Sequence, residues 1–214
     1  MLGVAYAVVL AFVVLVDYEE YHKAESLVFA EANAINNFQK DLHMFEEPFK
    51  SEAVREGINY AKLVVDHEWK TMNHGNRHDE TDKSMERLEA VIYNYSPKTD
   101  KEKVFYPFVL GYFKNMREMR LDRLIMSTSS LPGILYFVII VGYFITVAYT
   151  FFFSSLSVHA QITMTSLLSM SLVLIVFLIV EMDLPFSGST AVSPEPIEFV
   201  IKNIIAAAAQ APAK

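Results

Sequence analysis

The sequence predicts an all-α membrane protein with three transmembrane helices and a cytoplasmic helical bundle. Two stretches carry most of this prediction: Leu131 to Phe153 contains no charged residue, and Leu156 to Val180 has His159 as its only ionisable side chain. About 20 apolar residues are needed for a helix to cross the hydrocarbon layer of a membrane. Because the link from Ser154 to His159 is short, we expect these two spans to form an antiparallel hairpin.

The charged residues provide a third observation, because they are segregated from the apolar stretches. Of the 18 Lys and Arg residues, all but Lys202 and Lys214 lie between Lys23 and Arg123. This distribution predicts one water-exposed domain held between membrane segments. The formal net charge of -7 argues against a nucleic-acid partner, since phosphate binding requires clustered cations. The chain has no cysteine, which excludes disulfides and thiolate chemistry.

The first transmembrane helix is expected within residues 1–16, where Leu2 to Val16 is uncharged but short for a span. A signal peptide is a second interpretation, but the basic start is missing and the following Asp17 is a poor cleavage context. A buried amphipathic helix is a third, and it fits poorly because apolar residues cover every face. We favour a short transmembrane helix that continues as one long rod, since no helix breaker occurs between Gly3 and Glu47.

The soluble domain is expected to cover residues 17–130 as an all-helical bundle. Apolar residues recur there at three- and four-residue spacing, which is typical of amphipathic helices. Pro48 is expected to open the second helix, and Thr81 or Asp82 to cap the third. The four helices are expected at residues 17–42, about 49–72, from that cap to 95, and about 101–126.

The second and third transmembrane helices are expected at residues 131–153 and 156–182, followed by a tail at 183–214. In the tail, Ser193 is placed to cap a short amphipathic helix that ends at Ile205. The alanine-rich end that follows is expected to fray.

Positive charge sets the expected orientation in the membrane. Arg117, Arg120 and Arg123 immediately precede the second span, and the turn after that span contains no Lys or Arg. The positive-inside rule then places the soluble domain and the tail in the cytoplasm, and the N-terminus outside.

Several short motifs occur in order along the chain: YAVVLAFVV at the start, A-E-x-x-x-x-A-E-A-N-A at 24–34, V-V-D-x-E-W at 64–69, D-x-P-F-x-G at 183–188 and V-S-P-E-P at 192–196. Together they resemble the bacterial integral membrane proteins grouped as domain of unknown function 4239. The resemblance covers nearly the whole chain and implies an all-helical architecture in a bacterial inner membrane. Members of that family usually carry another apolar segment before the first motif, so a further span upstream is compatible with the pattern. No activity comes with the resemblance.

Acidic residues directly after the first span are the first candidate site. In a symmetric assembly, Asp17, Glu19 and Glu20 would form a ring of carboxylates that attracts cations at the mouth of a pore. Alternatively, they are a solvated collar where the helix leaves the membrane. Asp17 and Glu20 are our candidate ion-attracting residues.

A polar side of the last span is the second candidate. Hydroxyl and amide side chains in lipid commonly face another helix and bond across the contact. A hydrated pathway lined by Thr163, Ser166 and Ser169 is the alternative, with Thr163 and Ser166 as candidate lining residues. The polar residues of this span are His159, Gln161, Thr163, Thr165, Ser166, Ser169 and Ser171.

The remaining polar residues favour structural roles. Glu25 and Glu31 lie among alanines on the rod and are expected to pair with Arg117, Arg120 or Arg123, while Trp69 is expected to anchor the core. Glu19 and His22 have the spacing of a di-iron motif, but a second copy of that motif is missing. His74 and His78, near His67, Glu68 and Asp79, could bind a divalent metal, or they are solvated histidines of a polar loop, which we favour. We expect no metal, no cofactor and no enzyme, since common catalytic motifs are missing.

The function predicted from these observations is a homo-oligomeric channel, or related conduction protein, that favours cations. Its expected partners are the lipid bilayer and further copies of the chain. The alternative is a non-conducting accessory or scaffold subunit whose bundle binds a partner in a membrane complex. A third possibility is a sensor whose bundle binds a ligand.

Overall fold

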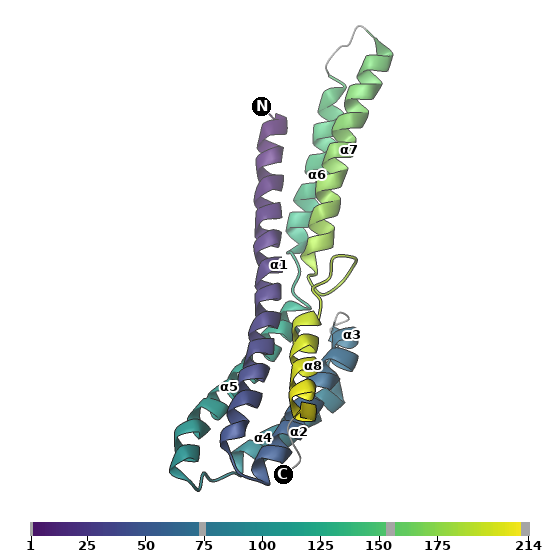
Figure 1. Cartoon of the computed structure of the whole chain (residues 1–214). Coiled ribbons are helices and arrows are strands. Elements are labelled where there is room, and N and C mark those ends of the chain that lie inside the picture. The colour runs from purple at the N-terminus through teal and green to yellow at the C-terminus, as the bar shows by residue number, and fades with distance from the viewer. Residues whose placement is uncertain (1, 73–75, 153–156, 211–214) are drawn as a thin grey trace. The chain divides into compact units, whose positions relative to one another are not determined.

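A computed structural model describes residues 2–72, 76–152 and 157–210, and within these ranges it contains helices and turns but no β-strand (Figure 1). The predicted all-α class is therefore confirmed. The chain divides into two compact units. We call them the hairpin unit, Met1–Lys23 with Ser129–Ala191, and the bundle unit, Ala24–Thr128 with Val192–Lys214.

Helix α1, Leu2–Asp41, is one continuous helix of 40 residues, and its two parts belong to different units. No proline occurs within it and its glycine is in the first turn, so nothing interrupts the helical hydrogen bonds. The predicted long rod is confirmed.

The hairpin unit combines the start of α1 with α6, Gly133–Thr150, and α7, Val158–Asp183, which lie side by side in Figure 1. One face of α1 supplies Tyr6, Leu10 and Val13 to the core, at the spacing of a helical stripe. Ile139, Leu172 and Ile179 complete that core from the other two helices. The predicted turn at Ser154 falls partly outside the described residues.

Most of the apolar surface of this unit remains uncovered. Helices α6 and α7 are long and apolar enough to cross a membrane, and only 11% of each apolar window is buried. On α1, Val8 and Phe12 are 63% and 66% exposed, on the face away from the core. Continuous apolar faces of this size are unfavourable in water, and they are typical of surfaces that contact lipid or a neighbouring subunit.

The bundle unit contains the end of α1 and a series of shorter helices. Elements along the chain are a 3₁₀ turn at Leu42–Met44, α2 at Phe49–Leu63, a π-helical segment at Val64–Glu68, α3 at Trp69–Met72, α4 at Asp79–Tyr93, α5 at Asp100–Met126 and α8 at Glu195–Gln210. Thr99 caps α5, because its hydroxyl accepts from the Glu102 amide while the Glu102 carboxylate accepts from the Thr99 amide. Ser193 caps α8 as predicted, accepting from the Glu195 amide at 3.2 Å.

Several expected boundaries were wrong. Pro48 precedes α2 rather than opening it, and α4 begins at Asp79 with His78 in the capping position instead of Thr81 or Asp82. The alanine-rich tail is helical as far as Gln210, because alanine has the highest helix propensity and continues α8 where we expected fraying.

Candidate functional site

A buried network of charges occupies the centre of the bundle unit. Arg123 on α5 donates through Nε to Oε2 of Glu31 on α1 at 2.7 Å, and through Nη2 to Oε1 of Glu68 at 2.9 Å. Tyr60 on α2 donates its hydroxyl to Glu31 at 2.8 Å. Arg123, Glu31 and Glu68 are fully buried. The predicted pairing of Glu31 with an arginine of the fourth predicted helix is thus confirmed.

A second arginine extends this network toward the surface. Arg120 contacts Glu68 through Nε and Nη2, and Nη2 also donates to Asp82 on α4 at 2.7 Å. Burial lowers the pKa of Arg120 and Arg123, but the neighbouring carboxylates outweigh it, so both pKa values lie above the usual arginine value. Both guanidinium groups therefore remain charged and paired, which indicates a structural clamp rather than a proton-transfer site.

The π-helical segment places Glu68 in this network. Hydrogen bonds in this segment join residues five apart instead of four apart, which rotates the following side chains relative to an α-helix, and Glu68 is buried at the end of the segment. The guanidinium group of Arg123 also lies 4.9 Å from the centre of the Trp69 ring, which the sequence had assigned to the core. The sequence analysis considered Glu68 only beside the histidines of a metal candidate and did not foresee its ion pairs, although it belongs to the V-V-D-x-E-W motif.

Polar groups also meet at one end of the hairpin unit. Asp183 accepts hydrogen bonds from the Leu131 amide at 2.5 Å and from the Tyr136 hydroxyl at 2.6 Å. Asp17 on α1 is 3% exposed, and its Oδ2 has no hydrogen-bond partner among the described residues. Asp183 is close enough for the two carboxylates to repel each other. The sequence analysis did not select Asp183 as a candidate site residue, although it is the first residue of the D-x-P-F-x-G motif.

The predicted ion-attracting residues differ in their surroundings. Asp17 is buried against α6 and α7, whereas Glu20 is exposed and lies 3.7 Å from Lys23. Within one chain, Glu20 is therefore open to its surroundings, whereas Asp17 is enclosed by the hairpin unit. Helix periodicity explains this difference, because Asp17 lies on the same face of α1 as the buried residues Tyr6, Leu10 and Val13, whereas Glu20 does not.

Polar residues of α7 divide into two groups. Ser169 bonds Tyr143 at 2.5 Å, Thr165 bonds Thr150 at 3.2 Å, and Gln161 donates to the Thr150 carbonyl at 2.8 Å, all across the hairpin. Thr163 and Ser166 are exposed, and Thr163 donates to the His159 carbonyl of its own helix. Ser169, named as a lining candidate, is therefore used in helix packing.

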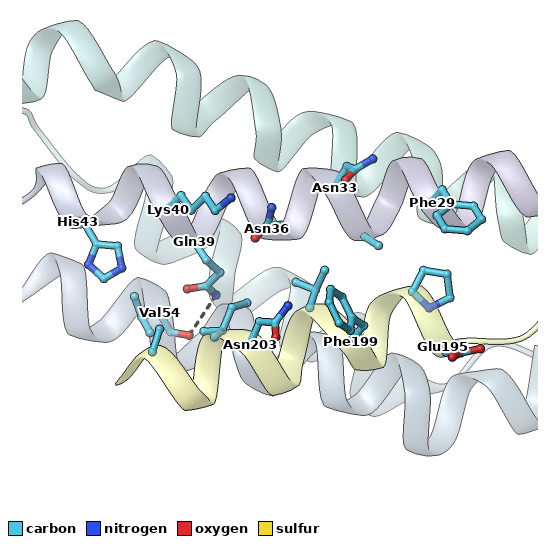
Figure 2. A pocket seen from close by; sticks show the side chains of 15 residues that line it. Phe29, Asn33, Asn36, Gln39, Lys40, His43, Val54, Glu195, Phe199 and Asn203 are labelled. Atoms are coloured by element: carbon cyan, nitrogen blue, oxygen red, sulfur yellow. Dashed lines mark hydrogen bonds between the residues drawn. The ribbon is translucent and has the colours of Figure 1, made fainter. Parts of the chain in front are cut away.

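A large cavity lies between α1 and α8, within the bundle unit (Figure 2). Its volume is about 900 Å³, and its walls are mostly apolar with a few amide groups. Phe29, Asn33, Asn36 and Gln39 line it from α1, and Phe199 and Asn203 from α8. The sequence analysis did not foresee this cavity, because it depends on where α8 packs.

Metal-binding geometry is absent from the parts of the chain that the structure describes, where no group of three potential ligands forms. His67 and His78 stack with their ring centres 5.1 Å apart. His74, of the predicted pair with His78, lies outside the described residues.

The architecture thus defines a class of protein: an all-helical chain that joins a hairpin of two membrane-length apolar helices to a bundle with a buried ion network. A family model described as Bestrophin-like domain matches residues 1–197, and the chain belongs to this family. The family inferred from the short motifs, domain of unknown function 4239, was therefore wrong, because such motifs carry less information than a match over the length of the chain.

Solved structures show the same fold. A bacterial bestrophin homologue from Klebsiella pneumoniae, carrying one mutation, aligns with a TM-score of 0.78 at 12% identity, covering 98% of this chain and 86% of the homologue. Another structure of a bestrophin homologue from that organism gives a TM-score of 0.77 at 13% identity, with 99% and 86% coverage. A structure described as a membrane protein gives the same four values. No curated protein matches the chain.

Proposed function

We propose that this chain is one subunit of a homo-oligomeric ion channel in the bacterial inner membrane. Membership of the bestrophin-like family carries the proposal, since bestrophin homologues are ion channels built from several copies. The uncovered apolar faces of α6 and α7 support a membrane location. The proposal assigns no catalytic role to the chain.

Three spans and a cytoplasmic bundle are the proposed topology. The first span covers Leu2 to Val16, and α6 and α7 are the second and third. Exposed apolar residues on α1, such as Val8 and Phe12, support contact with lipid or a second subunit. Arg120 and Arg123 now have a structural role, but their position before α6 still favours a cytoplasmic bundle.

A preference for cations is the finer part of the proposal. Glu19 and Glu20 are exposed directly after the first span, where carboxylates from several copies would attract cations. Glu20 is the better candidate of the two acidic residues predicted, because Asp17 is turned into the hairpin unit. Thr163 and Ser166 remain proposed lining residues, since both are exposed on α7.

Electrical recording tests the proposal. Purified protein in a planar bilayer should carry current, and the reversal potential in a KCl gradient should report the preferred ion. Glu20→Gln should shift that reversal potential toward the value of a channel that does not discriminate between K⁺ and Cl⁻. Glu52→Gln replaces an exposed carboxylate on α2 and should leave the reversal potential unchanged. Absence of current in several lipids and voltages would overturn the channel, and an anionic reversal potential would overturn the cation preference.

The mass of the assembly separates a channel from an accessory subunit. A closed ring of identical subunits in detergent supports a central pore, while one copy within a heteromeric complex supports a scaffold. The mass of the assembly thus distinguishes the predicted channel from the predicted scaffold subunit without any recording of current.

A further inference from the structure

A buried carboxylate without a compensating charge lies at one end of the hairpin unit. Asp17 on α1 is 3% exposed, and its Oδ2 has no hydrogen-bond partner among the described residues. Burial of an ionised carboxylate is unfavourable unless a cation or hydrogen-bond donors compensate it. In the sequence of the hairpin unit, the only Lys or Arg is Lys23, which is exposed and pairs with Glu20 at 3.7 Å. The surroundings of Asp17 therefore disfavour its charged form.

Helix register brings Asp183 into the same layer of the hairpin unit. Val13 on α1 and Ile179 on α7 both belong to the apolar core, and the two helices run in the same direction (Figure 1). Asp17 follows Val13, and Asp183 follows Ile179, by one helical turn. Tyr136 reaches this layer from α6, because its hydroxyl donates to Asp183 at 2.6 Å. The layer next to the apolar core thus contains two carboxyl groups.

The two carboxyl groups differ in the donors that they receive. Oδ1 of Asp183 accepts from the Leu131 amide at 2.5 Å, and Oδ2 accepts from the Tyr136 hydroxyl. Asp17 receives no such donor at Oδ2 within the described chain. A proton added at Oδ2 of Asp17 therefore displaces no hydrogen bond, and it removes a buried charge. Asp17 is the member of the pair that the geometry favours as the proton carrier.

The other titratable groups around this end of the hairpin unit are exposed or have other partners. They are Glu19, Glu20, Tyr21, His22, Lys23 and Glu181. The ionisation of Asp17 is accordingly governed by its burial and by Asp183. Burial, and after it the repulsion from Asp183, raises the pKa of Asp17 to about 6. Its protonated form is therefore populated at mildly acid pH.

We propose that Asp17 and Asp183 form a pH-sensitive contact that controls how tightly α1 packs against α7. At mildly acid pH, a proton on Asp17 removes the repulsion between the two side chains, and α1 stays packed on the hairpin. At alkaline pH, Asp17 releases this proton to solvent, and the two neighbouring negative charges loosen the contact at this end of α1. This contact does not require ion conduction, so the proposed channel and the pH-sensitive contact can fail separately.

Infrared difference spectroscopy follows the proton. Protein in lipid nanodiscs is titrated from pH 8 to pH 5, and the C=O band of a protonated carboxylic acid should appear with a midpoint near pH 6. Asp17→Asn should remove this band. Glu20→Gln is the matched control, because it replaces an exposed carboxylate on the same helix, and it should keep the band. Absence of the band in the wild type, or its persistence in Asp17→Asn, would overturn the proposal.

Distances between two spin labels follow the packing. Because the chain has no cysteine, Leu15→Cys on α1 and Val180→Cys on α7 provide two labelling positions, both exposed. Labelled protein is diluted with an excess of unlabelled protein, so that distances within one chain dominate. Double electron–electron resonance should give a narrow distance distribution at pH 5, and a broader one shifted to longer distances at pH 8. An unchanged distribution would contradict the proposed loosening of α1.

The same variants assign this response to one carboxyl group. Asp17→Asn cannot ionise and should keep the narrow distribution at both pH values, whereas Glu20→Gln should respond as the wild type does. If the asparagine variant does not fold, Asp17→Leu removes the same charge and takes its place. A pH response that survives without the Asp17 charge, or that Glu20→Gln also abolishes, would overturn the proposal.

Discussion

Arg123 on α5 and Glu31 on α1 form an ion pair, 2.7 Å between Nε and Oε2, with both side chains fully buried. Glu68, Tyr60 and Met72 satisfy the remaining polar atoms around this pair. The network thereby joins α1, α2, the π-helical segment, α3 and α5 at one point. A buried pair of this kind destabilises a fold strongly when one partner is removed, since the other charge is left without compensation.

Arg123→Met should therefore destabilise the protein by about 3–5 kcal/mol. Arg117→Met is the control, because Arg117 pairs with Glu89 at the surface and its loss should cost about 1 kcal/mol or less. Denaturant unfolding in detergent, followed by fluorescence of the single tryptophan, Trp69, measures both. Equal effects of the two substitutions would show that the network contributes little.

Glu102 should make the bundle unit sensitive to acid. The amides of Lys98, Thr99 and Glu46 donate to its carboxylate at 2.7, 3.1 and 3.2 Å. These hydrogen bonds, chiefly the one from the Lys98 amide, lower the pKa of Glu102 to about 2, although burial acts in the opposite direction and raises it. Because the folded pKa lies below the unfolded value of about 4.5, the stabilisation is complete above that value and is lost as pH falls through about 2.

Unfolding of wild type and Glu102→Gln across pH checks this. The wild type should be the more stable protein at pH 7, and the difference should shrink below pH 4.5 and vanish near pH 2. Glu52→Gln, at an exposed position of α2, should show no such trend. A difference that stays constant with pH would contradict the assignment.

Gly142 should be required for contact between α6 and α1. Tyr6 lies over it and donates to the Ile139 carbonyl at 2.6 Å, and a Cβ at 142 would meet the Tyr6 ring at 2.3 Å. Gly142→Ala should lower the melting temperature in detergent, by an overpacking cost of about 1–3 kcal/mol. Gly133→Ala in the same helix, where the new Cβ meets nothing within 4 Å, should change stability by about 0.5 kcal/mol or less.

Asp17 and Asp183 should respond in opposite directions to the same chemical change. Asp17→Asn removes a buried charge beside another carboxylate, and Oδ2 of this charge has no hydrogen-bond partner among the described residues; the substitution should raise stability by about 1 kcal/mol. Asp183→Asn weakens the acceptor of the Leu131 amide and the Tyr136 hydroxyl and should lower stability by about 1–3 kcal/mol. Melting temperatures at pH 7 that shift in the same direction would contradict this division of roles.

Local sequence predicts this fold well where the signal is periodic or compositional. The apolar stretches at 131–153 and 156–180 predicted α6 and α7. The absence of a helix breaker after Gly3 predicted the long α1. The pairing of Glu31 with an arginine was also predictable, because a carboxylate among alanines needs a partner. These features depend on neighbours in sequence or on the chemistry of one group.

An all-helical chain with segregated apolar and charged segments could be predicted from the sequence, because helix periodicity and composition are local properties. Only the packing of the helices places Glu68 of the π-helical segment in the core, buries Asp17 near Asp183, and leaves a cavity between α1 and α8 beside Gln39. Each of these depends on which helix faces pack together across long sequence separations, and the residues between them do not encode that choice locally.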